Sequence, residues 1–446
     1  MKSAMPKVLH KVGGLPMLGR VLNAAAEGGA TEIAVVVGPK AEAVAAFVKG
    51  AAPHATLHEQ HERLGTGHAV LAAKAAIANA GKDGTAVDVL VLYGDAPLVT
   101  GETLARARKA LAKGADVAVV GFRTSEPKGY GRLVEEKGRL VAIVEEKDAT
   151  AEQKRIGFCN AGIIAFRGEG LLPLLRKIGN RNAQGQYYLT DAIALANAAK
   201  RKVVTIEAGA DEAAGVNDRI QLSHVEGLFQ RRMRETAMAE GATMIAPSTI
   251  WFSHDTLIGR DVTIEPNVFF GPGVTVADNV VIRANSHIEG ARIACGAIIG
   301  PFARLRPGTI IGERAHIGNF VEVKNAKIDE GAKANHLSYI GDAQVGAGAN
   351  IGAGTITCNY DGFDKHWTKI GAGAFIGSNS ALVAPVTIGA GANIAAGSVI
   401  THDVAEDALA VARARQEDKP GWARKYKERM ALAKAGAKPK PPVGAK

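Results

Sequence analysis

Apolar residues return at every sixth position through the second half of the chain, and this is its strongest pattern. The repeat begins at Ile258, shifts by one residue at Ile293 and starts again at Ile370. A helix repeats near 3.6 residues and a strand near 2, so neither explains a sustained period of six. A hexapeptide β-helix does, because each six residues build one short strand and one turn with the apolar side chain inward. The repeated positions are Ile258, Ile264, Phe270, Val276, Ile282, Ile288, Ile293, Ile299, Leu305, Ile311, Ile317, Val323, Ile370, Ile376, Leu382, Ile388, Ile394 and Ile400.

The first half carries a different pattern, in which short apolar runs alternate with Ala-rich helical stretches. Continuous apolar runs that end in turn residues are typical of strands buried on both faces of a largely parallel sheet. The alternation predicts an open, mostly parallel, Rossmann-like α/β sheet, whose ligands bind beyond the carboxyl ends of the strands. The predicted strands lie in 32–38, 87–95 and 115–122, and the predicted helices in 41–50, 67–80 and 101–114.

A single amphipathic helix at 219–240 separates the two patterns, with Leu222, Val225, Phe229 and Met233 on one face. The β-helix follows it. Its longest interruption is 358–369, where a polar loop containing Tyr and Trp leaves the solenoid, as binding loops do. The expected domains are 1–218, a linker helix at 219–241, a β-helix at 242–412 and a basic tail at 413–446.

Composition narrows the class of protein. The chain has 446 residues, 47% of them hydrophobic, but no run of eighteen apolar residues and no secretory core at its N-terminus, so neither a membrane span nor export is expected. Three isolated cysteines favour a reducing cytoplasm over a disulfide framework or a zinc site. The net charge of +10 is concentrated in 411–446, where eleven basic residues face three acidic ones. We therefore interpret the charge as a solvated, partly disordered tail, and we expect no nucleic-acid partner.

Polar motifs follow the predicted strands of the first half. Asp95 comes at the end of the strand at 87–95, and Asn217 precedes the linker helix. Taken singly, each motif also has a structural reading, since Asp95 could cap a turn and Asn217 could cap the helix. In order, the motifs are Pro6-Lys7-Val8-Leu9, Gly14-x-Pro16-Met17, Leu64-Gly65-Thr66-Gly67, Tyr93-Gly94-Asp95-x-Pro97-Leu98, Gly129-Tyr130-Gly131-Arg132, Val144-Glu145-Glu146-Lys147, Asn160-Ala161-Gly162 and Gly215-Val216-Asn217.

Together and in this order, the motifs resemble those of sugar-1-phosphate nucleotidyltransferases. With the β-helix behind them, the chain resembles the bifunctional N-acetylglucosamine-1-phosphate uridylyltransferase/glucosamine-1-phosphate acetyltransferases from Lys2 to about Lys425. The resemblance implies a left-handed β-helix that assembles as a homotrimer. It implies that acetyl-CoA acetylates glucosamine-1-phosphate and that UTP, with Mg²⁺, then gives UDP-N-acetylglucosamine and pyrophosphate. That product feeds bacterial cell-envelope polysaccharides.

In the first half, the resemblance assigns Mg²⁺ to Asp95 and Asn217 and the nucleotide phosphates to Lys7. The uracil side is assigned to Gln60, Gly65 and Thr66, and the amino sugar to Gly131, Glu145 and Asn160. These residue types suit the reaction. Attack of a sugar phosphate on the α-phosphorus of UTP gathers several negative charges, so the site needs cations rather than a nucleophile. A carboxylate and an amide oxygen suit a hard cation.

One segment of the family pattern is missing. The family begins with a strand and a Gly-rich loop of the form L-x-x-G-x-G-T-R-M, whose backbone N–H groups cradle the triphosphate. Here Met1 aligns with the Met that closes that segment. We therefore expect a native start upstream of Met1, and severely impaired uridylyl transfer in a chain that lacks the loop.

In the second half, the resemblance makes His336 the proton acceptor for acetyl transfer. A lone His in a solenoid is usually a surface or corner residue, but an amine that attacks a thioester needs a base titrating near neutrality. The positions assigned to glucosamine-1-phosphate are Arg306, Lys324, Tyr339, Asn350, Asn359, Tyr360 and Lys365. Those assigned to acetyl-CoA are Ala353, Ser378, Ala396 and Arg413.

Three hypotheses stay open at this point. The chain is a cytoplasmic bifunctional enzyme, or an acetyltransferase whose first half is only a scaffold, or an assembly subunit whose β-helix only oligomerises. His336 and the 358–369 loop argue against the third, since a scaffold has no use for them. The presence of residues before Met1 would separate the first two.

Overall fold

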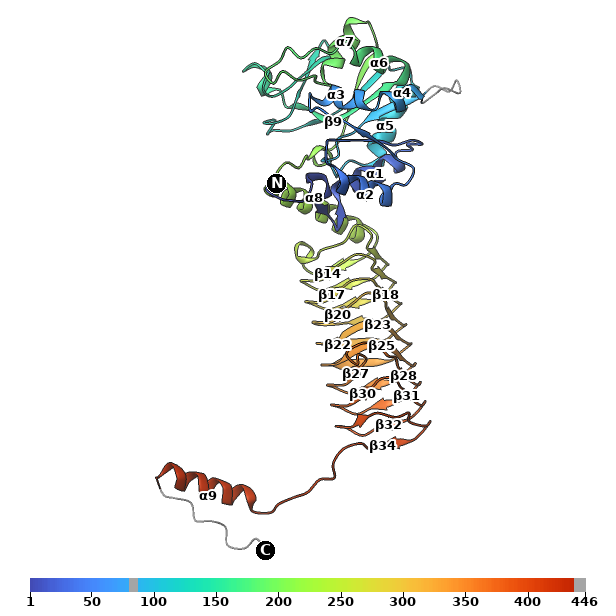
Figure 1. Ribbon diagram of the computed structural model, residues 1–446, viewed down its shortest axis with the longest axis vertical. Coiled ribbons are helices and arrows are strands. Elements are labelled where there is room, and N and C mark those ends of the chain that lie inside the picture. The colour runs from blue at the N-terminus through green and yellow to red at the C-terminus, as the bar shows by residue number, and fades with distance from the viewer. Residues whose placement is uncertain (80–86, 437–446) are drawn as a thin grey trace. The chain divides into compact units, whose positions relative to one another are not determined.

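The computed structural model describes residues 1–79 and 87–436, so the end of the helix expected at 67–80 and part of the basic tail lie outside the described residues. The chain forms two compact units, Met1–Gly296 and Ala297–Lys446. The first holds the α/β domain, a long helix and the first solenoid strands, and the second holds the remaining solenoid strands and the tail (Figure 1). The domain boundaries expected from sequence stay a prediction.

The α/β domain is built on a mixed sheet. The ten-residue strand β9 (Phe158–Arg167) runs antiparallel to both β5 (Asp88–Val91) and β6 (Val117–Arg123). On its other side, β6 pairs in parallel with the edge strand β10 (Val203–Glu207). Strands buried on both faces are continuous apolar runs in either direction, so their sequence predicts the strand but not its direction. The α/β class is confirmed. The remaining strands are β1 (Lys11–Val12), β2 (Leu15–Pro16), β3 (Ala34–Val37), β4 (Thr56–Glu59), β7 (Arg132–Glu136) and β8 (Arg139–Val144).

The four helices that the sequence predicts are present, one of them divided, and the structure adds helices that the sequence analysis did not predict. The stretch expected at 67–80 forms two short helices, α3 (Thr66–Ala72) and α4 (Lys74–Asn79), because the chain leaves helical geometry at Ala73. The expected linker helix is α8 (Arg219–Ala239), whose Asp218 side chain caps the Gln221 N–H. The others are α1 (Met17–Glu27), α2 (Glu42–Ala51), α5 (Gly101–Ala112), α6 (Gly168–Leu175), α7 (Asp191–Ala198), α9 (Trp422–Lys434), η1 (Lys7–Leu9), η2 (Gln153–Arg155), η3 (Ala210–Ala213) and η4 (Pro247–Thr249).

Short parallel strands in both units form the left-handed β-helix that the repeat predicts. Every repeated apolar position except Ile258 is at most 4% exposed. Truncating one such side chain to Ala would cost about 2–5 kcal/mol. The strands are β11 (Thr243–Met244), β12 (Leu257–Ile258), β13 (Thr263–Ile264), β14 (Phe269–Phe270), β15 (Thr275–Val276), β16 (Val281–Ile282), β17 (His287–Ile288), β18 (Ala291–Ile293), β19 (Ile298–Ile299), β20 (Arg304–Leu305), β21 (Thr309–Ile311), β22 (His316–Asn319), β23 (Glu322–Ile328), β24 (Lys333–His336), β25 (Tyr339–Val345), β26 (Asn350–Ile351), β27 (Ile356–Cys358), β28 (Thr368–Ile370), β29 (Phe375–Ile376), β30 (Ala381–Val383), β31 (Val386–Ile388), β32 (Asn393–Ile394), β33 (Val399–Ile400) and β34 (Leu409–Ala410).

The solenoid continues through the stretch where the sequence repeat fades. Ala334 and Thr357 fill inward positions there, each 1% exposed, and the Thr357 hydroxyl bonds the backbone of Gly341. A small and a polar residue at these positions hide the period from a search for large apolar side chains. Cys358 ends β27 and β28 starts at Thr368, so the strand-free part of the loop is 359–367.

The basic tail is more ordered than the sequence indicates. Residues 422–434 form α9, in which Trp422 stacks on Tyr426 with ring centroids 5.1 Å apart. No residue of this helix is buried.

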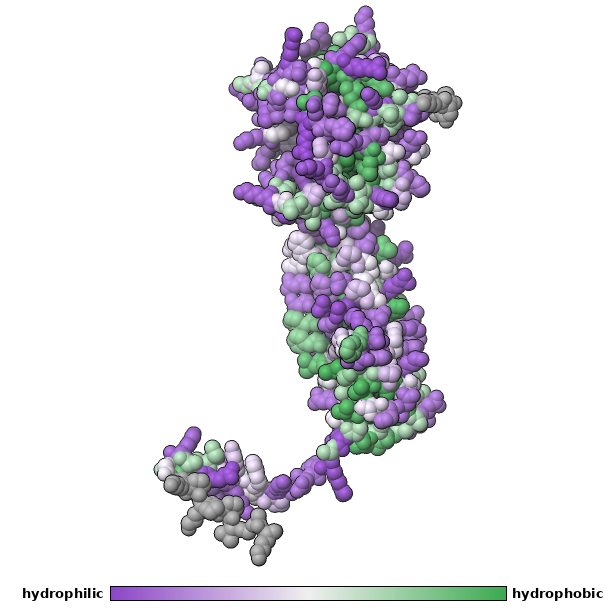
Figure 2. Space-filling model, in the orientation of Figure 1, coloured by the Kyte–Doolittle hydropathy of each residue, from purple (hydrophilic) through white to green (hydrophobic). Residues whose placement is uncertain are grey.

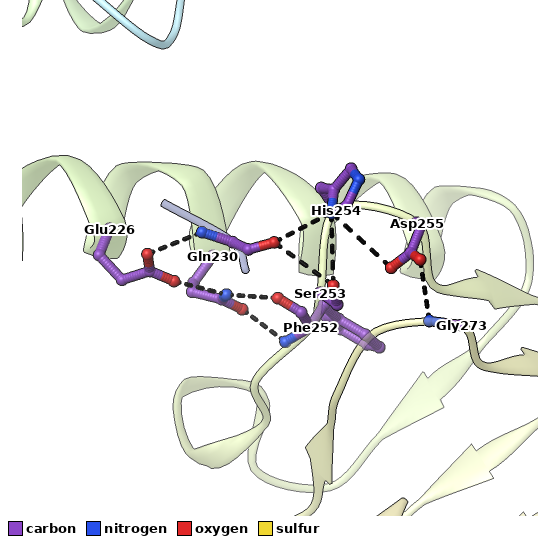
Figure 3. Close-up of polar contacts among 8 residues, drawn as sticks. Glu226, Gln230, Phe252, Ser253, His254, Asp255 and Gly273 are labelled. Carbon is purple, nitrogen blue, oxygen red and sulfur yellow. Dashed lines mark hydrogen bonds and ion pairs between the residues drawn. The ribbon is translucent and has the colours of Figure 1, made fainter. Parts of the chain in front are cut away.

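A polar network joins α8 to the first solenoid turns within the first unit (Figure 3). Gln230 is 2% exposed, and its amide donates to the Phe252 carbonyl (2.6 Å) and accepts from the Phe252 N–H (2.7 Å). Glu226 accepts from Gln230 and from the N–H of Gly13, in the turn between β1 and β2. Gly13 has φ +59°, and a Cβ there would collide with the Phe229 ring, so only glycine fits this contact.

Candidate functional sites

The first unit brings Lys7, Asp95 and Asn217 together, as the motifs predict. The Lys7 ammonium on η1 lies 2.5 Å from Asp95 Oδ2, after β5, and 3.0 Å from Asn217 Oδ1, before α8. A backbone bond from Val216 N–H to the Asp95 carbonyl (2.9 Å) fixes the last two segments side by side. One carboxylate and one amide oxygen thus converge on a single cationic group.

These oxygens suit a divalent cation. Mg²⁺ commonly takes one or two protein oxygens and completes its shell with water and phosphate, which agrees with a pair rather than a full cage. Within residues 1–79 and 87–436, no group of three His, Cys, Asp or Glu side chains is placed to bind a metal. Asp95 and Asn217 together supply the kind of donors that such a cation takes.

The predicted sugar contacts also meet, at the ends of three neighbouring strands. A Cβ added to Gly131 would lie 3.5 Å from Glu145 Oε2 and 3.6 Å from Asn160 Cβ. The Asn160 N–H donates to the Gly131 carbonyl at 2.8 Å. Burial raises the pKa of Glu145, whose other oxygen accepts a hydrogen bond from Thr190 at 3.1 Å. The three residues predicted to contact the amino sugar thus lie side by side.

Gln60, Gly65 and Thr66 form the third predicted group. Gln60 directly follows β4, and its amide donates to the Gly65 carbonyl at 3.1 Å. Thr66 begins α3, and its hydroxyl accepts from the Leu189 N–H at 2.9 Å. Hydrogen bonds between these side chains and the backbone therefore hold Gln60, Gly65 and Thr66 in place without a ligand.

Two further side chains belong to this site and received no role from the sequence. Burial raises the pKa of Tyr93 to about 12, with the Glu145 carboxylate contributing and the Thr66 hydroxyl in hydrogen-bond contact. Tyr93 therefore stays neutral and links the two predicted binding groups. Thr190 is 1% exposed and orients Glu145. Tyr93 belongs to the motif that contains Asp95. This was the only sequence feature that could have identified it as a site residue.

The second unit places His336 at the exposed end of β24. Its Nδ1 lies 2.6 Å from Asn319 Oδ1, one coil earlier. The tautomer with its hydrogen on Nδ1 can donate to this amide oxygen, and that tautomer leaves the Nε2 lone pair free for a proton acceptor. Asn319 received no role from the sequence, although it stands seventeen residues before His336, about one coil.

The predicted sugar-phosphate residues lie on neighbouring coils and on the loop. Interaction with the Lys365 side chain lowers the pKa of Lys324, as two cations near each other would. Arg306 pairs with Glu322 (2.8 Å), and Tyr339 stands beside Glu322 in the next coil. Two like charges held together are the usual arrangement for receiving a phosphate.

Asn359, Tyr360 and Asn350 complete the predicted set. Asn359 is 7% exposed at the base of the loop, and Tyr360 and Lys365 face each other in an antiparallel bridge. Asn350 lies in β26, between Lys333 and Phe375 of the adjoining coils.

An open pocket of about 650 Å³ contains two of the residues predicted for acetyl-CoA. Arg413 lies beside Gly397, whose added Cβ would be 3.9 Å from Arg413 Cδ. Ala353 lies one coil before Ser378. Its carbonyl accepts a hydrogen bond from the N–H of Asn379, the next residue, at 2.7 Å. The pocket is lined by Phe375, Gly377, Ser378, Asn393, Ile394, Ala395, Ala396 and Leu409.

A consecutive Ser253-His254-Asp255 run at the junction in Figure 3 is not a catalytic triad. Ser253 Oγ (3.4 Å) and Asp255 Oδ1 (3.8 Å) both approach the same ring nitrogen, Nδ1 of His254. A relay needs the serine and the carboxylate on opposite ring nitrogens. The run is part of the structural contact between α8 and the solenoid.

Comparisons with known proteins agree with both halves. Residues 1–156 match a MobA-like NTP transferase domain, and 255–290, 290–325 and 368–402 match the bacterial transferase hexapeptide (six repeats). The chain is 58% identical to the bifunctional protein GlmU of Azorhizobium caulinodans over 99% of this chain and 96% of the relative. The chain belongs to the GlmU family. It is also 58% identical to the GlmU of Xanthobacter autotrophicus (96% and 94% covered) and 56% to that of Agrobacterium fabrum (98% and 96%).

Membership of this family confirms the resemblance found in the motifs, the fold class and the assignment as a transferase with two activities. Among the helices of the described residues, none is long and apolar enough to cross a membrane. The individual roles of the site residues stay predictions.

Proposed function

We propose that this chain makes UDP-N-acetylglucosamine in two steps, acetyl transfer to glucosamine-1-phosphate and uridylyl transfer to the N-acetylated product. Membership of the GlmU family supports both reactions. The observation that carries the residue assignments is the pairing of two unlike sites. One gathers a lysine, a carboxylate and an amide, and the other presents an exposed histidine held by Asn319, with two lysines whose charges interact.

In the acetyl transfer, the amine of glucosamine-1-phosphate attacks the thioester carbonyl of acetyl-CoA, and the CoA sulfur leaves. His336 Nε2 accepts the proton that the amine loses. Lys324, Lys365 and Arg306 bind the sugar phosphate, and Tyr339, Asn350, Asn359 and Tyr360 contact the sugar. Ser378, Ala396, Ala353 and Arg413 contact acetyl-CoA. The open pocket around Ser378 and Ala396 supports this assignment.

In the uridylyl transfer, a phosphate oxygen of N-acetylglucosamine-1-phosphate attacks the α-phosphorus of UTP, and pyrophosphate leaves. Asp95 and Asn217 would hold Mg²⁺, which supplies charge neutralisation for the phosphates. Lys7 contributes a second cation, and Gly131, Glu145 and Asn160 hold the amino sugar. Gln60, Gly65 and Thr66 bind the uracil side.

We further propose that the chain works as a cytoplasmic homotrimer assembled through its β-helix. Both acetyl-CoA and UTP are cytoplasmic metabolites. Exposed apolar side chains support self-association, since Phe302 and Phe320 stack at 5.1 Å while 47% and 55% exposed, and Leu337 is 62% exposed. Figure 2 shows apolar surface along the solenoid.

The test is one reaction of this chain with glucosamine-1-phosphate, acetyl-CoA, UTP and Mg²⁺, followed by mass spectrometry. UDP-N-acetylglucosamine among the products would support both steps and would contradict the impairment of uridylyl transfer that the sequence predicts. If the reaction stops at N-acetylglucosamine-1-phosphate, the chain is an acetyltransferase alone. If glucosamine-1-phosphate is unchanged, the proposed use of the solenoid site is wrong.

A further inference from the structure

A buried carboxylate that received no role from the sequence lies between the solenoid and the base of its loop. Asp342, in β25, is 3% exposed. Its Oδ1 accepts a hydrogen bond from the Asn325 side-chain amide at 2.6 Å, and its Oδ2 accepts one from the Asn359 side-chain amide. Asn325 is seventeen residues before Asp342 and Asn359 seventeen after, so the three side chains form a continuous ladder across three coils.

The ladder has only one arrangement of donors and acceptors. A carboxylate only accepts, so both amides must turn their NH₂ groups toward Asp342. Such charge-assisted bonds in a buried site are stronger than bonds between neutral groups. The Asn359 side chain is thereby held in one orientation.

Asn359 is the residue at which the loop leaves the solenoid. The His366 N–H donates to the Asn359 carbonyl at 2.9 Å, so the returning strand of the loop is fixed to the same residue. Lys365 and Tyr360 lie between these two points and face each other. The position of Asn359 therefore constrains the backbone of the loop on both sides of Lys365.

The Asp342 carboxylate also interacts electrostatically with the cations that are predicted to bind the sugar phosphate. Lys365 lowers the pKa of Lys324, Arg306 acts in the same direction, and Asp342 opposes them. Without a nearby negative charge, two lysines and an arginine at one place would disfavour each other's charged forms. Asp342 lies beside Lys324, because Lys324 pairs with Gly341 in the adjoining coil and precedes Asn325, whose amide bonds Asp342.

We propose that Asp342 is a positioning residue for acetyl transfer, which fixes the base of the 359–367 loop through Asn359 and places a negative charge beside Lys324, one of the cations predicted for the sugar phosphate. The inference rests on the proposed acetyltransferase function. It adds a residue that contacts no substrate but sets the affinity for one.

The sharpest variant is Asp342→Asn, which keeps the shape and replaces one acceptor by a donor. One of the two neighbouring amides then faces a donor with its own NH₂ group, and the site loses its negative charge. We expect the KM for glucosamine-1-phosphate to rise roughly tenfold, with a smaller change in kcat and little change in the KM for acetyl-CoA. The loss of kcat/KM at high pH should begin at lower pH than in the wild type, because Lys324 would release its proton more readily.

Asn325→Asp provides the second arm. Alone it places two carboxylates against each other and should also weaken binding of the sugar phosphate. Combined with Asp342→Asn, it restores both bonds. The new carboxylate at position 325 accepts from the new amide at position 342, whose oxygen accepts in turn from Asn359, and the negative charge returns to the ladder. The double variant should recover to within about threefold of the wild-type KM.

Asp403→Asn is the matched control, because its carboxylate also accepts an N–H in the solenoid, from Thr387 at 2.7 Å, but far along the sequence from the loop. Size-exclusion chromatography monitors assembly of all variants. A wild-type KM in Asp342→Asn would overturn the inference. So would a double variant as impaired as the singles, which would mean that Asp342 matters only for folding. If the wild-type chain itself does not acetylate glucosamine-1-phosphate, the proposed function fails instead.

Discussion

The two halves of this chain place their functional residues in opposite ways. In the solenoid, side chains that meet are about one coil apart in sequence, as in Asn319 with His336 and Asp342 with Asn359. In the α/β domain, Lys7 meets Asp95 across 88 residues and Asn217 across 210. In a repeat, residues about one coil apart in sequence are neighbours in space. In an open sheet, residues far apart in sequence become neighbours only through the order of the strands. The solenoid site should therefore tolerate changes in the α/β domain, and the reverse.

The strongest way to sharpen this comparison is His336→Ala. Loss of the proton acceptor should lower kcat for acetyl transfer about 10²- to 10⁴-fold. Uridylyl transfer from UTP to supplied N-acetylglucosamine-1-phosphate should not change, because no group of the α/β site is altered. His402→Ala, another exposed solenoid histidine that bonds only its neighbour Thr401 among the described residues, is the control. Acetylation at the wild-type rate would remove His336 as the base.

The reciprocal experiment is Asp95→Asn. This change removes the carboxylate that converges with Asn217 on the Lys7 ammonium, so uridylyl transfer should fall about 10²- to 10³-fold. The Mg²⁺ concentration needed for half-maximal rate should rise as well. Acetyl transfer is measured in the same preparation and should stay at the wild-type rate. A parallel loss of both activities would contradict the independence of the two sites.

The difference between the halves also explains what the sequence could predict. The period of six identified the solenoid and its inward residues, and it failed only where Ala334 and Thr357 take inward positions. In the α/β domain the strands were evident from their apolar runs, but the direction of β9 was not, because burial on both faces looks the same either way. Lys7, Asp95 and Asn217 were grouped by resemblance and not by spacing.

The residues that the sequence left without roles share a property. Thr190, Asn319 and Asp342 each bond a residue that is predicted to contact a substrate, namely Glu145, His336 and Asn359 respectively. Their types are common and their motifs are weak, so only three-dimensional contact identifies them. The repeat could nevertheless have identified Asn319 and Asp342, since each lies seventeen residues, about one coil, before its partner.

Asn319→Leu tests whether that spacing has catalytic meaning. Leucine fills a similar volume but cannot accept from His336 Nδ1, so the imidazole can rotate or change tautomer. We expect kcat for acetyl transfer to fall about 10- to 100-fold with the KM for both substrates nearly constant. Asn319→Asp keeps the acceptor and should retain most of the activity. Equal activity in the Leu and Asp variants would show that Asn319 does not orient the base.

The smallest expected effect concerns the α/β domain. There, Arg132 forms hydrogen bonds near the strand ends that carry the predicted sugar contacts. Arg132 is 1% exposed and lies 2.6 Å from Glu146 Oε2, and it also donates to the carbonyls of Tyr130 and Lys154. Hydrogen bonding to Arg132 lowers the pKa of Glu146 below its ordinary 4.5. The folded state therefore gains stability from this carboxylate above about pH 4.5, and loses it as the pH falls through the lowered pKa.

Glu146→Gln should thus lower the Tm of the α/β domain by a few degrees at neutral pH, and the difference from wild type should shrink below pH 4.5. Glu207→Gln is the control, because its pair with Arg123 at 3.2 Å is half exposed and should contribute little at any pH. Calorimetry between pH 3.5 and 7, roughly one unit below the ordinary pKa to neutrality, separates the two. A constant difference across that range would mean that Glu146 stabilises the fold by packing rather than by charge. Since the solenoid lacks this pair, its own transition should be the same in both variants.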